Sequence, residues 1–115
     1  MKTYEGVANP PTPYPSDVNA AGHWMVLVNG QTLPIGPSRK IWNHSEGFSW
    51  GYAGSGPAQL SLALLLDALK DRRRAVRLHQ SFKFRVVAAW PKDEGWQITD
   101  IEIRQICNEL EQERQ

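Results

Sequence analysis

The stretch from Gly47 to Leu69 constrains the fold more than any other, because it joins two patterns of local structure across a glycine-rich turn. Phe48, Trp50 and Tyr52 alternate along the chain, which is the spacing of a β-strand. The leucine-rich run that follows is typical of a helix buried on most sides. The sequence therefore predicts an aromatic strand, a glycine turn and a buried helix, with bare backbone N–H groups at their junction.

The start of this helix is predicted at Ser55-Gly56-Pro57. Ser55 or Gly56 can act as the N-cap, and proline suits the first turn. At 100° per residue the leucines cover most of the helix surface, so we expect this helix to be the core around which the sheet is built. A thin polar face remains, formed by Gln59, Ala63, Asp67 and Lys70. Asp71 and the arginines after it end the helix, and residues 75–80 add a short helical turn.

Five segments have the composition of strands. Residues 1–7 alternate weakly and predict an edge strand. Residues 24–28 and 31–33 flank Asn29-Gly30, the pair that a type I′ hairpin turn requires. Apolar residues alternate with Lys83 and Arg85 between Phe82 and Trp90, which predicts a strand with one buried face. Residues 96–98 form a short strand after the turn at residues 91–95.

The C-terminal segment predicts an amphipathic helix. Thr99 and Glu102 have the spacing of a capping box, and Ile98 and Ile103 occupy the hydrophobic-staple positions. One apolar face follows, formed by Ile103, Ile106, Cys107 and Leu110. We therefore predict an α+β domain, in which a mostly antiparallel sheet packs against two helices.

Length and composition favour one soluble domain. The chain has 115 residues, 41% hydrophobic and 22% charged, and we expect residues 1–115 to fold as a single domain with a proline-rich loop at 8–22. Cys107 is the single cysteine, which rules out an internal disulfide. No secretory leader and no run long enough to span a bilayer are visible, so we expect a cytoplasmic protein.

The segment from Asn43 to Ala89 resembles a family of small bacterial and mobile-element proteins known as a domain of unknown function. Three stretches carry the resemblance: NHS at 43–45, GFSWGYAGSGPAQL at 47–60, and FK at 82–83 with VVA at 86–88. A tryptophan and a terminal helix bearing isoleucines follow. The resemblance implies no particular chemistry, but it does imply a prokaryotic setting associated with plasmids or phages.

The glycine-rich junction has two candidate activities. Gly54, Ser55 and Gly56 open a helix, where free N–H groups and the helix dipole favour an anion. Alternatively Ser55 is a hydrolase nucleophile, with His44 as base and Glu46 or Asp67 orienting it. The pattern lacks a third glycine for a dinucleotide fingerprint, and neither a P-loop nor a G-x-S-x-G elbow is present. A tight packed turn is the simpler interpretation, and we predict no catalytic residues.

A basic segment is the candidate nucleic-acid interface. Seven cations and one acid lie between Lys70 and Arg85, although the net charge of the chain is only +1. The candidate phosphate contacts are Arg72, Arg73, Arg74, Arg77, Lys83 and Arg85. Residues 100–115 are acidic in turn, a division of charge that is compatible with a homodimer.

His23, His44 and His79 are scattered in the sequence, so we predict neither a metal site nor a cofactor.

Aromatic side chains are the third candidate for function. Five tryptophans are unusual in a chain of this length. We expect Trp50 and Trp90 to be buried on strands, and Trp24, Trp42 and Trp96 to lie near strand ends as exposed anchors for a protein partner. Because a catalytic constellation is missing, the sequence favours a non-enzymatic protein-binding module. Its mobile-element setting makes inhibition of a host system a natural role. Nucleic-acid binding, and hydrolysis or anion binding, remain the alternatives.

Overall fold

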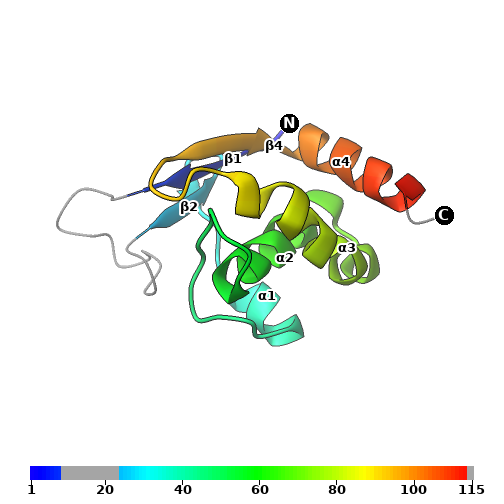
Figure 1. The fold of residues 1–115 in the computed structure, drawn as a ribbon, viewed down its shortest axis with the longest axis horizontal. Coiled ribbons are helices and arrows are strands. Elements are labelled where there is room, and N and C mark those ends of the chain that lie inside the picture. Colours follow the sequence, from blue (N-terminus) through cyan, green and yellow to red (C-terminus); the bar gives the residue numbers. More distant parts are fainter. Residues whose placement is uncertain (9–23, 114–115) are drawn as a thin grey trace.

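The computed structural model describes residues 1–8 and 24–113, so most of the proline-rich loop, and His23, lie outside the described residues. Its sheet has the order β3-β2-β1-β4, and every neighbouring pair is antiparallel (Figure 1). The strands are β1 (Thr3–Val7), β2 (Met25–Val28), β3 (Gln31–Thr32) and β4 (Trp96–Thr99). The predicted α+β class is confirmed. The prediction that residues 1–7 form an edge strand is wrong, because β1 lies between β2 and β4.

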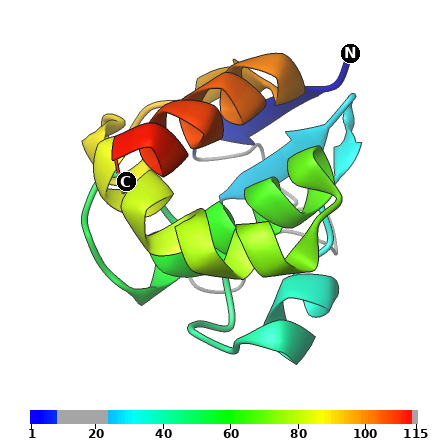
Figure 2. The same cartoon turned by 90° about the vertical axis from the view of Figure 1, so that its right-hand side faces the viewer.

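Helices make up the rest of the described chain. They are α1 (Gly36–Ile41), α2 (Ser55–Leu69), α3 (Arg72–Arg85) and α4 (Asp100–Glu113), with a short 3-10 helix, η1 (Val87–Ala89), after α3. The sequence predicted two helices, and the described residues form four. In Figures 1 and 2, α2 lies between the sheet and α1, and the red end of α4 lies over the yellow-green turns of α3. Within the described residues, no helix is long and apolar enough to cross a bilayer.

Two local predictions are confirmed. Asn29 and Gly30 have φ values of 49° and 81°, as a type I′ turn requires, and Val28 pairs with Gln31 across it. At the start of α4, Thr99 Oγ1 accepts a hydrogen bond from the Glu102 N–H at 3.1 Å, and Glu102 Oε1 accepts one from the Thr99 N–H at 2.9 Å. Both are set by residues within four positions, which is why the sequence specifies them.

The start of α2 differs from the prediction by one residue. Gly54 is the N-cap, in an extended conformation, and Ser55 is already helical. The helix is largely buried, as predicted, and residues 56–65 are buried without exception. Gln59, expected on a polar face, is completely buried. Its amide is satisfied by hydrogen bonds that bear on the candidate site.

Residues 82–90 do not form the predicted strand. They continue α3 to Arg85 and then form η1, so α3 is far longer than the predicted turn at 75–80. Ala75, Leu78 and Phe82 are fully buried at helical spacing, whereas Phe84 is 64% exposed. The end of α3 and the short helix η1 follow each other directly in this segment. Their apolar residues together give the alternation that is typical of a strand, although they belong to two helical elements.

The aromatic segment at 48–52 is not a strand either. It is an irregular loop in which Trp50 is fully buried between two other indoles. Trp50 stacks on Trp24 at 4.4 Å between ring centroids and meets the edge of Trp96 at 5.5 Å, and Trp96 stacks on Trp90 at 4.1 Å. Tertiary stacking, not strand pairing, therefore produces the burial. Trp24 and Trp96 are 8% and 7% exposed, so the prediction that they are exposed partner anchors is wrong.

Candidate functional site

Trp42 is the one tryptophan with a largely exposed side chain, at 48%. It follows α1, and its N–H donates to Ser38 O at 2.9 Å, which ends that helix. The indole stacks on the His44 ring at 4.7 Å between centroids and meets the edge of His79 at 5.3 Å. Trp42 is thus the predicted partner anchor that the structure does place at the surface, held in position by two histidines.

Gln59 fixes the segment that carries Trp42 and His44. Its Oε1 accepts hydrogen bonds from the backbone N–H groups of His44 at 2.6 Å and Ser45 at 3.0 Å. Its Nε2 donates to Ser38 Oγ at 2.9 Å. One buried amide on α2 therefore ties together α1 and the segment after it, and satisfies polar groups that burial would otherwise penalise.

His44 and His79, which are far apart in the sequence, form a hydrogen-bonded pair with their Nε2 atoms 2.9 Å apart. His79 Nδ1 lies 2.6 Å from Val76 O. A carbonyl oxygen accepts only, so His79 carries its proton on Nδ1 and its neutral ring presents a bare Nε2. His44 must then donate from Nε2, which leaves His44 Nδ1 as the unprotonated nitrogen. The 35-residue separation gave no signal in the sequence.

Both imidazoles are held neutral by their surroundings. Burial lowers the pKa of His44 below its usual value, and the charges of His79 and Lys83 lower it further. Burial also lowers the pKa of His79, again with Lys83 contributing, and the hydrogen bond to Val76 partly opposes this.

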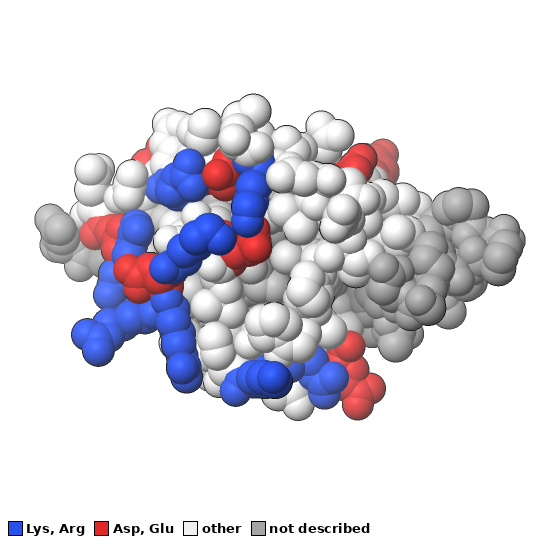
Figure 3. Space-filling view, turned by 180° about the vertical axis from the view of Figure 1, so that it is seen from behind, with Lys and Arg blue, Asp and Glu red and all other residues white. Residues whose placement is uncertain are grey.

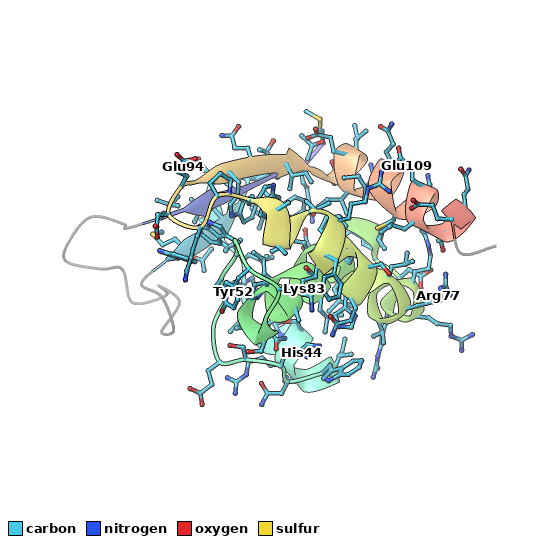
Figure 4. All side chains as sticks on the ribbon, in the orientation of Figure 1. His44, Tyr52, Arg77, Lys83, Glu94 and Glu109 are labelled. Carbon is cyan, nitrogen blue, oxygen red and sulfur yellow. The ribbon has the colours of Figure 1, made fainter. Side chains whose placement is uncertain are left out.

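Lys83 supplies a positive charge to the same site. It follows His79 by one helical turn and is 7% exposed, so its methylene stem is buried. The ammonium lies 4.1 Å from the centroid of the Phe84 ring and has no carboxylate or hydrogen-bond partner among residues 1–8 and 24–113. Figure 4 labels Lys83 on α3 and His44 on the segment after α1.

A groove of about 690 Å³ lies between the end of α1 and the first turns of α3. Ile41 and Val76 give it an apolar floor, and arginines line its sides (Arg72, Arg73 and Arg77). We call this groove, with Trp42, His44, His79 and Lys83, the α1–α3 face. It combines an exposed indole, an apolar floor and cations.

Several predicted phosphate contacts pair with α4, and Arg77, which also lines the groove, is one of them. Arg74 and Arg77 both bind Glu111, at 2.6 Å each, and Arg85 binds Glu109 and Glu113. Arg74 and Arg77 lower the pKa of Glu111 by hydrogen bonding and by charge. In Figure 3, basic and acidic side chains accordingly interleave at the end of the molecule away from the larger grey segment. The basic segment is therefore divided between two sides of α3.

The glycine junction is closely packed. A Cβ on Gly56 would lie 1.9 Å from Ser49 Oγ, and one on Gly54 would lie 2.4 Å from the Tyr52 ring. Ser49 and Tyr52 hydroxyls share a hydrogen bond of 2.9 Å. The absence of a side chain at these two glycines thus lets the aromatic loop pack against the start of α2. Ser55 between them is exposed.

The predicted Ser55 triad does not assemble. The His44 ring engages His79 through Nε2, and Asp67 accepts hydrogen bonds from Tyr4 Oη at 2.5 Å and Lys2 Nζ at 3.2 Å. Asp67 also follows Ser55 by about 18 Å along the helix axis, at 1.5 Å per residue. Asp67 therefore has a structural role at β1.

No cluster of three metal-binding side chains occurs in the described parts of the chain. Cys107 is fully buried on α4, and burial raises the pKa of its thiol to about 11. It is therefore a core residue and an unreactive thiol, as its position on the apolar helix face indicated.

Fold and surface together define a small α+β domain whose most exposed tryptophan, Trp42, lies beside a basic groove. The chain belongs to a family of unknown function, DUF6166, whose model matches residues 14–109. This agrees with the resemblance to a domain of unknown function in the sequence. No curated protein and no solved structure matches the chain.

Proposed function

We propose that this protein is a non-enzymatic module that binds another protein through the α1–α3 face. The observation that carries the proposal is the exposed Trp42 beside the apolar floor of Ile41 and Val76. Tryptophan and arginine are the residue types that most often dominate binding energy at protein interfaces. The resemblance noted in the sequence supports a bacterial mobile element or phage as its setting, and inhibition of a host system as its role.

The architecture of the face also supports binding by a preformed surface. Gln59 and the histidine pair fix the indole from behind, so a partner would meet a rigid anchor. A rigid anchor loses little conformational entropy on binding. The cations Arg72 and Arg73 at the groove favour a partner surface that combines apolar and acidic groups.

A photo-crosslinking amino acid placed at position 42 tests this proposal. We expect it to capture one discrete protein from a lysate of a bacterial host that carries the element. The same group at Ile101, which is 51% exposed on α4, is the matched control. Trp42→Ala should also weaken co-purification of the captured protein by about tenfold or more, the usual loss for a hot-spot aromatic. Equal capture from positions 42 and 101 would contradict the proposal.

Nucleic-acid binding is the second candidate, because Arg72 and Arg73 line the groove near an exposed indole that can stack on a base. This candidate predicts binding of single-stranded oligonucleotides that weakens steeply with salt and falls when both arginines become alanine. Binding that does not depend on salt, or its absence, removes it. A hydrolase at Ser55 has less support, since its partners do not assemble, and activity retained by Ser55→Ala would end that candidate.

A further inference from the structure

The His44–His79 pair has one place for an additional proton. His79 Nδ1 already donates to Val76 O, and its Nε2 must stay bare to accept from His44. A proton on His79 Nε2 would set two N–H groups against each other across 2.9 Å. A proton on His44 Nδ1 leaves the internal hydrogen bond intact. The pair therefore takes up its proton on His44 Nδ1.

His44 Nδ1 is available to a ligand. It makes no hydrogen bond to the described residues, and it is not sealed from solvent, since the buried side-chain atoms without a partner there are Ser61 Oγ and Trp96 Nε1. Lys83 Nζ is likewise without a hydrogen bond to the described residues and is not sealed from solvent. Its stem is more than nine-tenths buried, and its charge acts on both imidazoles. Lys83 follows His79 by one helical turn, and the His79 ring contacts the His44 ring at 2.9 Å, so the two nitrogen groups lie in one region and are left for an external acceptor.

The charged groups around the pair are all basic. Lys83 and His79 on α3 are the groups that act on His44 by charge, and Lys83 is the one that acts on His79. The α2 helix contributes the uncharged amide of Gln59, and α1 contributes Ser38 and the Trp42 that follows it. Glu46, the acid nearest in sequence, is exposed and has no ion pair with the described residues. A site of this kind attracts an anion.

We propose that His44 Nδ1 and Lys83 Nζ bind a carboxylate from an acidic side chain of the protein partner, and that binding takes up one proton. The inference rests on the proposed function in naming a protein as the source of the carboxylate. On binding, the lone pair of His44 Nδ1 takes a proton from solvent, and the new N–H donates to one carboxylate oxygen. His44 Nε2–H continues to donate to His79, and the Lys83 ammonium donates to the carboxylate.

The site fits a carboxylate better than the other ligands of histidine. A metal ion would have two imidazoles and no third ligand in the described residues, with the repulsive Lys83 beside them. A phosphate group usually gains backbone N–H donors at a helix start. The side chain of Asp71 occupies that position on α3, accepting from the Arg74 N–H at 3.1 Å. A single carboxylate can accept from one imidazolium and one ammonium.

Acetate is the probe for this inference, and histidine ring ¹⁵N spectra of the full chain are the measurement. In the free protein we expect His79 protonated on Nδ1 and His44 on Nε2. Acetate should raise the pKa of His44 by about one unit at saturation, which is about tenfold tighter binding to the protonated form. Sodium chloride at equal ionic strength is the control. An unchanged His44 pKa in acetate would overturn the proposal.

Two variants and a second anion complete the test. Lys83→Met keeps the buried stem and removes the charge, so it should abolish the effect of acetate, whereas Lys40→Met on the exposed part of α1 should retain it. An equal acetate effect in Lys83→Met would also overturn the proposal, as would a larger effect of inorganic phosphate than of acetate. If Lys83→Met does not fold, the wild-type titration alone decides. Crosslinking at position 42 is a separate measurement, so protein binding can hold when the carboxylate inference fails.

Discussion

The two sides of α3 carry similar charges and have opposite surroundings. Toward α4, its arginines meet carboxylates in four ion pairs (Arg74, Arg77 and Arg85 with Glu109, Glu111 and Glu113). Toward α1, Lys83 has no carboxylate partner in the described structure and lies near two neutral imidazoles. The charges on the α4 side of the helix are therefore neutralised within the molecule, whereas the α1 side attracts anions.

This difference shows that a cluster of cations in a sequence does not define a basic surface. Seven cations fall between Lys70 and Arg85, yet the neighbouring helix neutralises part of them. The same pairing removes the argument for a homodimer from charge, because the acidic and basic segments meet within one molecule. What remains for recognition is the smaller set on the α1–α3 face.

The largest expected effect is on the α1 side, from Gln59→Ala. The substitution leaves the N–H groups of His44 and Ser45 without their acceptor. We expect a loss of about 2–6 kcal/mol in the free energy of unfolding, at about 1–3 kcal/mol for each of the two unsatisfied groups. Urea unfolding measures it, with exposed Gln97→Ala in β4 as the matched control. A loss no larger than that of the control would mean that Gln59 does not hold the site.

A smaller effect is expected on the α4 side when Glu109, Glu111 and Glu113 are all changed to glutamine. Partly exposed ion pairs contribute little, so we expect a loss of about 1–2 kcal/mol in total, reduced by salt. The freed arginines should then strengthen binding of single-stranded oligonucleotides relative to the wild type at the same salt. Thermal unfolding and fluorescence anisotropy measure the two effects. Unchanged oligonucleotide binding would contradict the idea that α4 neutralises this side.

The smallest expected effect is a difference between the two sides of α3 in how they make folding stability depend on pH. His44 and His79 have lowered pKa values in the folded state. Their contribution to the free energy of unfolding is therefore fully present above the unfolded histidine pKa of about 6.5, and it is lost as pH falls through the folded values. Glu111, whose pKa is also lowered, contributes above the unfolded glutamate pKa of about 4.3 and is lost only in stronger acid.

Urea midpoints measured between about pH 7.5 and pH 5 should therefore fall with pH in the wild type. The fall should be smaller in His79→Gln, which keeps an acceptor for His44 and lacks the titrating ring. The Glu111→Gln variant should behave as the wild type does over this range. A fall of the same size in His79→Gln would mean that groups other than this histidine pair cause the pH dependence.

Local patterns predicted the parts of the fold that local contacts specify. The turn at Asn29-Gly30 and the capping box at Thr99 are decided within four residues, and both are confirmed. The boundaries of α3 were missed because its charged face weakened the helical spacing of Ala75, Leu78 and Phe82. Alternation over residues 82–90 then favoured a strand.

The candidate site was less predictable, because tertiary contacts create it. Trp42 was identified as an anchor by its position near the end of an element, but the same reasoning failed for Trp24, which stacks on a residue 26 positions away. The His44–His79 pair depends on the packing of α3 against the segment after α1. Buried Gln59 was the one available signal, since a polar residue inside a leucine-rich helix needs partners.

The arrangement of the indoles also has a spectroscopic consequence. Three of them are buried, and the partly buried Trp90 stacks on Trp96, while Trp42 lies apart at the surface. Acrylamide should therefore quench chiefly the emission of Trp42, whereas coupled transitions of the four contacting indoles report on the integrity of the core. The chain thus carries two independent optical reporters, one for occupancy of the α1–α3 face and one for folding.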